Sequence, residues 1–256
     1  MRDWQSYLNF TISKQPRLVC APETLLLITV AFNNLETIKI QYSLLRKYFS
    51  NPFCYLVVDN SSDKLISCQI RDYCKEQAIA YARPALRLYR SASKSHGSAL
   101  NWAYHHLVKQ TTCRYFGFLD HDIYPTKTTG ILQFLSKQPI YGLLQERVEK
   151  WYLWPGFCFF DRQFLVDIRL NFSPQEGLVD TGGMNYYNLY RHLDKTRLIF
   201  PNQDYRQIAD SQIIQESSVE LIGDWLHTFN ASGWLKLGNA SRRELAISKI
   251  ITDLLK

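Results

Sequence analysis

The first 120 residues alternate continuous apolar runs with amphipathic stretches, and this alternation is the feature that most constrains the fold. The runs Leu25–Phe32 and Tyr55–Val58 have no polar face, as expected of strands that are buried on both sides. Between them, residues 35–49 space their apolar side chains as one face of a helix. This order predicts a right-handed β-α-β unit with parallel strands.

The same pattern continues and then stops. We expect helices at 66–77 and 98–110 and strands at 78–82 and 115–119, whereas from Trp151 onwards the regular alternation is lost. The sequence therefore predicts an α/β fold with a Rossmann-like, mostly parallel sheet flanked by helices and a less regular second half. The expected organisation is an extension at 1–24, a domain at 25–240 with halves at 25–135 and 136–240, and an amphipathic helix at 241–256.

Composition limits the class of protein and of partner. Of the 256 residues, 46% are hydrophobic and 21% are charged, a balance typical of a globular chain. No apolar run has the length of about eighteen residues that a transmembrane helix requires, and the first residues resemble a cytoplasmic start. The six cysteines form no C-x-x-C pair, so we expect reduced thiols. The net charge of +7 leaves nucleic acid, anionic membranes and phosphorylated ligands open.

The strongest local signal is YFGFLDHD, in which an apolar strand ends in Asp120, His121 and Asp122. In an open parallel sheet, ligands bind beyond the carboxyl ends of the strands. If the strand geometry persists, the two carboxylates point to one side and offer oxygen ligands to Mg²⁺ or Mn²⁺. The alternative is that both acids line a polar turn or cap the next helix.

Two common nucleotide-binding signatures are absent. The sequence has neither G-x-x-x-x-G-K-[ST] nor G-x-G-x-x-G among its eleven glycines, which disfavours a P-loop protein and the usual dinucleotide fold. Phosphate binding would therefore depend on a metal and on basic side chains. The segment ARPALRLYRSASKSHG, with Arg83, Arg87, Arg90 and Lys94, offers such cations, although charge runs of this kind are usually solvated.

Four segments in order, ITVAFNN, YLVVDNSSD, SHGSALNWA and FGFLDHDIYP, resemble the nucleotide-sugar half of GT-A glycosyltransferases, closest to the family 2-like group. The resemblance covers about residues 25 to 135. Further on, WPGFCFFDRQFL and VDTGG are similar in placement to acceptor-side segments of such enzymes.

The resemblance implies a set of site residues. A divalent cation, Mn²⁺ or Mg²⁺, would be held by Asp120, Asp122 and His227, although a single histidine is more often structural. His96, His105, His106 and His192 are expected to be structural. The positions implied to contact the nucleotide-sugar donor are Val30, Phe32, Asn33, Asp59, Arg90, Lys94, Asn101 and Asp120.

On the acceptor side, the resemblance implies Asp180 as the base that deprotonates the attacking hydroxyl, with inversion at the anomeric carbon. The Glu-Asp pair typical of family 2 is absent, so Glu146 and Glu149 remain alternative bases. Trp154, Gly182 and Trp234 are expected to contact the acceptor or the sugar, because an aromatic face suits the C–H side of a pyranose.

The expected activity is metal-dependent hexosyl transfer from a nucleotide sugar to a hydroxyl of a glycan or lipid-linked acceptor, in glycan biosynthesis. The expected location is cytoplasmic, with peripheral association at the inner membrane face left open, and no nucleic-acid partner is expected. Two other classes remain. A nucleotidyltransferase shares this fold type but usually has a glycine-rich basic loop after its first strand, where this chain has AFNNLET; the other is a non-catalytic nucleotide-sugar-binding protein.

Overall fold

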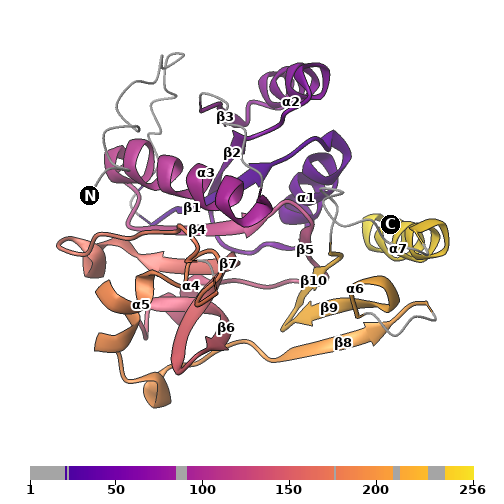
Figure 1. Ribbon diagram of the computed structural model, residues 1–256. Helices are drawn as coiled ribbons and strands as arrows, with labels where there is room; N and C mark the ends of the chain where they lie inside the picture. Colours follow the sequence, from indigo (N-terminus) through magenta and orange to yellow (C-terminus); the bar gives the residue numbers. More distant parts are fainter. Residues whose placement is uncertain (1–20, 22, 85–90, 176, 210–213, 230–239) are drawn as a thin grey trace.

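The computed structural model describes residues 21, 23–84, 91–175, 177–209, 214–229 and 240–256. Its centre is a six-stranded sheet in the order β3-β2-β1-β4-β7-β6 (Figure 1). The strands β1 (Leu25–Ala31), β2 (Phe53–Asp59), β3 (Ala80–Ala82) and β4 (Tyr115–Asp120) are parallel. The antiparallel hairpin of β6 (Ile140–Arg147) and β7 (Lys150–Asp161) extends the sheet beyond β4. The predicted fold class, α/β with a mostly parallel sheet flanked by helices, is confirmed.

Helices cover both faces of this sheet. Apolar side chains of α1 (Leu35–Tyr48) and α2 (Lys64–Glu76) pack on one face, and those of α3 (Ala92–His106) pack on the other. All seven residues of β1 are buried, and each leucine or isoleucine buried there contributes about 1.5–3 kcal/mol. The core is thus built around β1, which fixes the carboxyl edge of the sheet.

Helix α3 begins at Ala92, earlier than the Ser98 that we expected. The side chain of Ser91 caps it by accepting a hydrogen bond from the backbone N–H of Lys94 at 3.4 Å. Its first turn carries Ser93, Lys94 and His96, which do not continue the apolar periodicity. The apolar periodicity that predicts a helix therefore begins after the first turn of α3, so the predicted helix started too late.

A second sheet occupies part of the half that we expected to be irregular. The strands β5 (Ile123–Pro125), β10 (Trp225–His227), β9 (Ser218–Ile222) and β8 (Gln203–Gln207) pair antiparallel in that order. All five residues of β8 are exposed, and β5 and β10 have three residues each, so neither length nor hydrophobicity marked them. Because β5 follows Asp122 directly, this sheet places β10 beside the aspartate motif.

The C-terminal helix α7 (Ala240–Leu255) packs against its own domain. Ile251 belongs to an apolar cluster with Leu44 of α1, Tyr124 of β5 and Leu226 of β10. The side chains of Lys47 and Tyr48 each donate a hydrogen bond to the carbonyl of Leu254 at 3.0 Å. The other α-helices among the described residues are the single turns α4 (Leu132–Leu135), α5 (Asn185–Asn188) and α6 (Ile214–Ser217). Short 3₁₀ helices span Val108–Gln110, Arg162–Leu165, Tyr190–His192 and Lys195–Arg197. In the described part of the chain, no helix has both the length and the apolar character needed to cross a membrane.

The cysteines follow the sequence expectation in part. Cys74, Cys113 and Cys158 are free and buried, and Cys68 is free and exposed. Cys54 is disulfide-bonded, so the expectation of reduced thiols is wrong at this position. Cys20 lies outside the described residues.

Candidate active site

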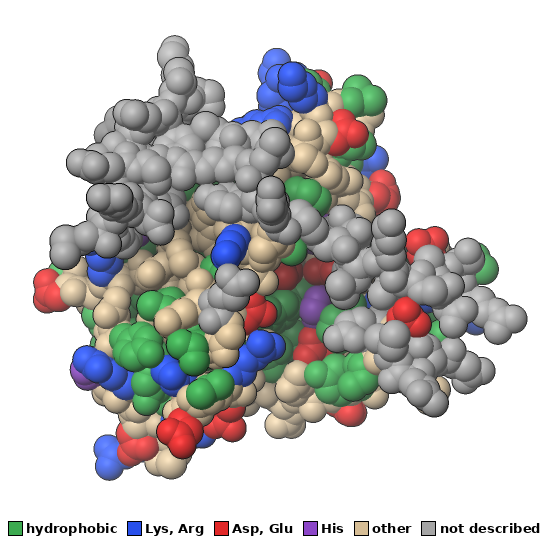
Figure 2. Space-filling model, in the orientation of Figure 1, with side chains coloured by type: hydrophobic (Ala, Val, Ile, Leu, Met, Phe, Trp, Pro, Cys, Tyr) green, Lys and Arg blue, Asp and Glu red, His purple; other side chains and the backbone are tan. Residues whose placement is uncertain are grey.

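Polar side chains meet at the carboxyl edge of the parallel strands. The strand register pairs Ala31 of β1 with Asp59 of β2, and Val30 of β1 with Asp120 of β4. The two aspartates therefore flank the end of the central strand, where an open α/β sheet binds its ligands. Figure 2 shows acidic and histidine side chains gathered in a hollow on this face of the molecule.

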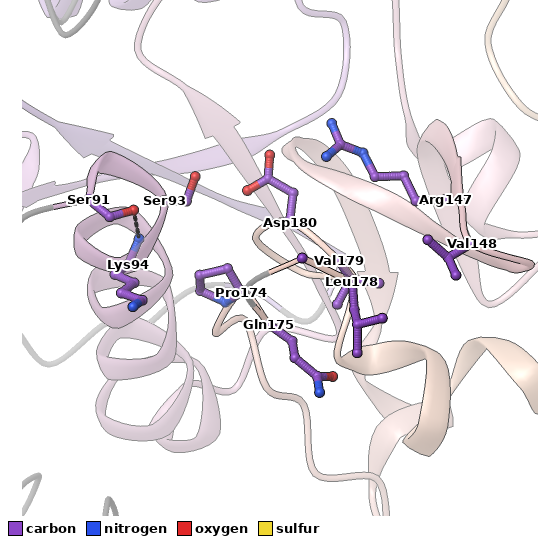
Figure 3. Close-up of a pocket in the computed structure, with 11 residues that line it drawn as sticks. Ser91, Ser93, Lys94, Arg147, Val148, Pro174, Gln175, Leu178, Val179 and Asp180 are labelled. Atoms are coloured by element: carbon purple, nitrogen blue, oxygen red, sulfur yellow. Dashed lines mark hydrogen bonds between the residues drawn. The ribbon is translucent and has the colours of Figure 1, made fainter.

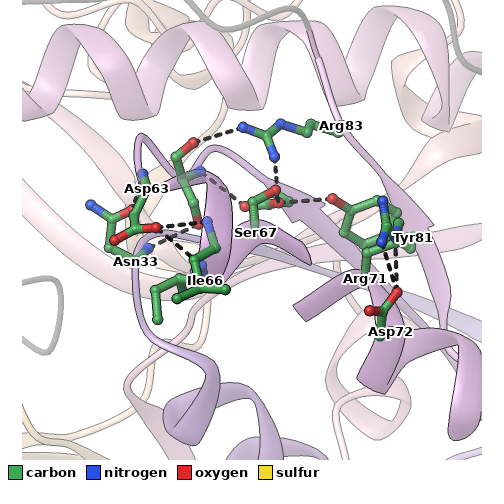
Figure 4. Close-up of polar contacts among 11 residues, drawn as sticks. Asn33, Asp63, Ile66, Ser67, Arg71, Asp72, Tyr81 and Arg83 are labelled. Carbon is green, nitrogen blue, oxygen red and sulfur yellow. Dashed lines mark hydrogen bonds and ion pairs between the residues drawn. The ribbon is translucent and has the colours of Figure 1, made fainter. Parts of the chain in front are cut away.

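Asp59 is buried and held by several donors. Its carboxylate accepts hydrogen bonds from the backbone N–H of Ser61 at 2.9 Å, from the Tyr81 hydroxyl at 2.8 Å and from the Ser67 hydroxyl. The guanidinium of Arg83 lies 3.6 Å from the same carboxylate (Figure 4). Burial and the Asp59 carboxylate raise the pKa of Tyr81, which keeps its hydroxyl a donor at neutral pH. The role of Asp59 in binding a base stays a prediction.

The loop after β1 is tied to the loop after β2 by Asn33, which takes a positive φ of 49°. Its amide donates to the hydroxyl of Ser62 at 2.8 Å and accepts from the backbone N–H of Asp63 at 2.9 Å. Asp63 in turn caps α2 by accepting from the N–H groups of Leu65 and Ile66 (Figure 4). Asn33 thus fixes the shape of this edge. Of the other predicted donor contacts at the end of β1, Val30 is buried and Phe32 is half-buried.

The aspartate motif does not continue the strand. β4 ends at Asp120, His121 and Asp122 form a turn, and β5 starts at Ile123. The two carboxylates therefore differ in environment, with 23% of the Asp120 side chain exposed against 6% for Asp122. Burial lowers the pKa of His121, and the Asp122 and Asp120 carboxylates oppose this shift.

A buried glutamine of α1 holds this turn at both ends. The amide nitrogen of Gln41 donates to the carbonyls of Asp120 and Ile123, each at 2.8 Å. Its amide oxygen accepts from the hydroxyls of Thr29 at 2.7 Å and Tyr55 at 2.6 Å. All donors and acceptors of this fully buried side chain are therefore satisfied, as a buried amide requires. Gln41 was not predicted as a site residue, because its only signal in the sequence is a polar residue on the apolar face of a predicted helix.

The second sheet brings His227 close to Asp122. The Nε2 atom of His227 lies 3.6 Å from Oδ1 of Asp122, and Nδ1 lies 2.6 Å from Oε2 of Glu220. Glu220 and His227 are register partners on β9 and β10, and both are buried. Glu220 was not predicted as a site residue. The available signal was an acid seven residues before the histidine with Gly223 between them, a spacing that suits a hairpin.

The carboxylates around His227 favour the protonated form of its imidazole. Burial by itself lowers the pKa of His227, but the carboxylates of Asp122 and Glu220 outweigh burial, so the pKa is raised. Arg243 of α7 is buried nearby and donates to the carbonyls of Thr228 and Phe229. Burial lowers the pKa of Arg243, and Asp122 opposes this shift.

The side chains that could hold a divalent cation are Asp122 and His227. The hydrogen bond from Nδ1 to Glu220 leaves Nε2 facing Asp122, the arrangement by which a carboxylate orients a metal-binding imidazole. Among the described residues, no group of three or more His, Cys, Asp or Glu side chains is placed to hold a metal. Two protein ligands would leave the other positions of a divalent cation to phosphate oxygens and water, as is usual for Mg²⁺.

Asp120 contacts His96, which we expected to be structural. The Nε2 atom of His96 lies 3.3 Å from Oδ1 of Asp120. Two neighbours in the same turn of α3 bind other loops. The hydroxyl of Ser95 accepts from the Asn60 amide at 2.9 Å, and the carbonyl of Ser93 accepts from the Thr181 hydroxyl at 3.2 Å. The first turn of α3 therefore connects the aspartate motif with the segment that carries Asp180.

Asp180 lines a pocket of about 620 Å³ beside this turn (Figure 3). The pocket lies between the start of α3, the tip of the β6–β7 hairpin and the residues 174–175 and 177–180. Lys94 and Arg147 line it as well. The Asp180 carboxylate accepts the backbone N–H of Thr181 at 2.7 Å. Of the alternative bases, Glu146 pairs with Lys195 and Glu149 lies in the exposed hairpin turn, and neither lines the pocket.

The remaining predicted site residues lie in different parts of the structure. Trp154 is half-buried and packs on the imidazole of His227, with ring centroids 4.9 Å apart. Asn101 is buried and bonds the backbone of Phe172 and the side chains of Asn171 and Ser173, which ties α3 to that segment. Gly182 takes a φ of 85° in a turn. Arg90 and Trp234 lie outside the described residues.

No protein-family model matches the sequence, and no curated protein matches it. Among solved structures, the chain is similar to TarS of S. aureus, with 18% identity and a TM-score of 0.40 over 58% of this chain. It is also similar to the mannosyltransferase PcManGT from Pyrobaculum calidifontis in complex with GDP-Man and Mn²⁺, with 15% identity and a TM-score of 0.43 over 64% of this chain. A third similar structure is the bifunctional glycosyltransferase WbbM, with 7% identity and a TM-score of 0.39 over 60% of this chain. The chain covers 30%, 51% and 34% of these three structures.

Proposed function

We propose that this protein is a glycosyltransferase that moves a sugar from a nucleotide-sugar donor to a hydroxyl acceptor. The observation that carries the proposal is the juxtaposition of Asp122 and His227, with Nε2 of His227 3.6 Å from Oδ1 of Asp122, at the carboxyl edge of a parallel sheet. A nucleoside diphosphate placed there would meet Asp59 on one side of β1 and Asp120 on the other.

In this proposal, Asp122 and His227 hold a divalent cation, Mn²⁺ or Mg²⁺, together with the donor diphosphate. When bound, such an ion neutralises charge on the leaving diphosphate. Glu220 keeps the imidazole oriented, and Gln41 keeps the aspartate turn in place. Asp120 lies nearest the ribose, held by His96 at 3.3 Å. Asp59 and the loop fixed by Asn33 receive the base, and Lys94 supplies a cation beside the diphosphate.

Asp180 is the proposed base. Its carboxylate lines a pocket next to α3, so an acceptor in that pocket can pass its hydroxyl proton to Asp180 as the oxygen attacks the anomeric carbon. Direct attack of this kind inverts the anomeric configuration. The acceptor class that the resemblance implies, a glycan or a lipid-linked sugar, belongs to the same proposal, as does peripheral membrane association.

The test is a thermal-shift panel of UDP-, GDP-, CMP- and dTDP-sugars, each with and without Mn²⁺. We expect at least one nucleotide sugar to raise the melting temperature only when Mn²⁺ is present. A protein that no nucleotide sugar stabilises with metal would contradict the proposal. Stabilisation by a nucleoside triphosphate instead, with release of pyrophosphate in the presence of a sugar phosphate, would favour a nucleotidyltransferase.

A further inference from the structure

The pocket around Asp180 is lined by both apolar and charged side chains. Apolar side chains form one part, and two of them are partly open to solvent, with Val148 59% and Leu178 38% exposed. The charged side chains that line it among the described residues are Lys94, Arg147 and Asp180. A sugar ring can pack its C–H face on the apolar wall, while a charged substituent needs a partner of opposite sign.

Arg147 is placed over this pocket by a tight hairpin. It pairs with Lys150 across the turn, and the two residues between them, Val148 and Glu149, take φ values of 48° and 60°, as in the two-residue turns of twisted hairpins. The adjacent Glu146 forms an ion pair with Lys195. Figure 3 shows Arg147 and Asp180 extending from opposite walls into the same space.

The charge of Arg147 favours a ligand with an anionic group. Arg147 makes no ion pair with any other residue that the structure describes. A guanidinium offers paired N–H donors that match carboxylate and phosphate geometry. Asp180 is the only carboxylate among the described lining residues, and it is required for the acceptor hydroxyl.

We propose that this pocket binds an acceptor that carries an anionic group, a phosphate or a carboxylate, close to the hydroxyl that receives the sugar. The inference rests on the proposed function and specifies its acceptor. In this arrangement Arg147 binds the anionic group, Asp180 faces the hydroxyl and Val148 contacts the ring. In the proposed function the donor lies beside Asp120, which His96 of α3 contacts, so the donor site adjoins this pocket.

The test measures binding of three probes to the full chain by calorimetry: α-D-glucose 1-phosphate, D-glucuronate and D-glucose. We expect at least one charged probe to bind about tenfold more tightly than D-glucose, the effect of one charge-assisted hydrogen bond. The two charged probes distinguish a phosphate from a carboxylate. Arg147→Gln should remove this preference, whereas Lys150→Gln, on the facing strand and outside the pocket lining, should keep it.

Three results would overturn the inference: equal affinity for charged and neutral probes, no binding of any probe, or equal loss in Arg147→Gln and Lys150→Gln. Displacement of the charged probe by UDP or GDP with Mn²⁺ would also overturn it, because the pocket would then belong to the donor. Failure of the proposed function is distinguishable. It would appear as charged-probe binding at this pocket in a protein that binds no nucleotide sugar with metal.

Discussion

The Nδ1 atom of His227 lies 2.6 Å from Oε2 of Glu220, and this contact leaves Nε2 facing Asp122 at 3.6 Å. The three side chains come from β9, β10 and the turn after β4, so they meet only when the second sheet packs beside the end of β4. The imidazole is held between two carboxylates and covered by Trp154 and Phe229. This geometry fixes the orientation of the imidazole and shields it from solvent.

Replacing Glu220 tests that orientation. Glu220→Gln keeps the size of the side chain but removes the charge that holds Nδ1, so we expect the affinity for Mn²⁺ in the presence of donor to fall by about 10-fold or more. The measurement is a Mn²⁺ titration in which nucleotide binding is followed. Asp224→Asn is the matched control, because Asp224 is in the adjacent turn and pairs only with Lys127 among the described residues, at 2.9 Å. Equal Mn²⁺ affinity in Glu220→Gln and in the parent would contradict the orienting role.

Gln41 offers a test of the aspartate turn. Gln41→Met keeps most of the volume but leaves the carbonyls of Asp120 and Ile123 and the hydroxyl of Tyr55 without their partner. Buried groups left unsatisfied cost about 1–3 kcal/mol, so the urea midpoint should fall. If Gln41 also positions the turn, Mn²⁺ affinity should fall in conditions where the variant is fully folded. A folded variant with the parent Mn²⁺ affinity would limit Gln41 to a structural role.

The parts of the fold that the sequence predicted are those in which hydrophobicity decides the structure. The strands around Leu25–Ala31 and the helices α1 and α2 follow from buried runs and apolar faces. The second sheet was not predicted, because β8 is exposed along its whole length and β10 has three residues. Pairing with neighbouring strands defines these segments, and pairing leaves no periodic signal in a single strand.

Stability should depend on pH through His105, near the end of α3. Burial, with smaller contributions from Lys109 and Arg169, lowers the pKa of His105 to about 4. In the unfolded chain an imidazole takes up its proton near pH 6.5. Between these values the unfolded state binds a proton that the folded state does not, so stability falls as the pH decreases through that window. His105→Gln should make the urea midpoint less dependent on pH between 6.5 and 4.

The control for that measurement is His192→Gln, because His192 is an exposed histidine. This variant should show the same acid-induced loss of stability as the parent. If His105→Gln and the parent lose stability equally between pH 6.5 and 4, burial of His105 is not the cause of the loss.

The site was predicted where a motif lies on one strand end and was missed where it depends on tertiary contacts. Asp120 and Asp122 follow an apolar strand, and this position alone indicated a ligand site. Glu220 and Gln41 belong to separate elements, and their roles appear only in the contacts with His227 and with the carbonyl of Asp120. His96 has no motif around it in the sequence, and its contact with Asp120 depends on the packing of α3 beside the end of β4.

The central claim is that Asp122 and His227 form a metal-dependent site for a nucleotide-sugar donor. The most direct measurement is release of the sugar from the best-binding donor, with and without Mn²⁺, in the parent and in Asp122→Asn. The carboxamide keeps the shape of the side chain but removes the charge that binds the cation. We expect Mn²⁺-dependent hydrolysis in the parent and its loss in Asp122→Asn, with an unchanged melting temperature in the absence of ligand. Unchanged turnover in a folded Asp122→Asn variant would contradict the claim.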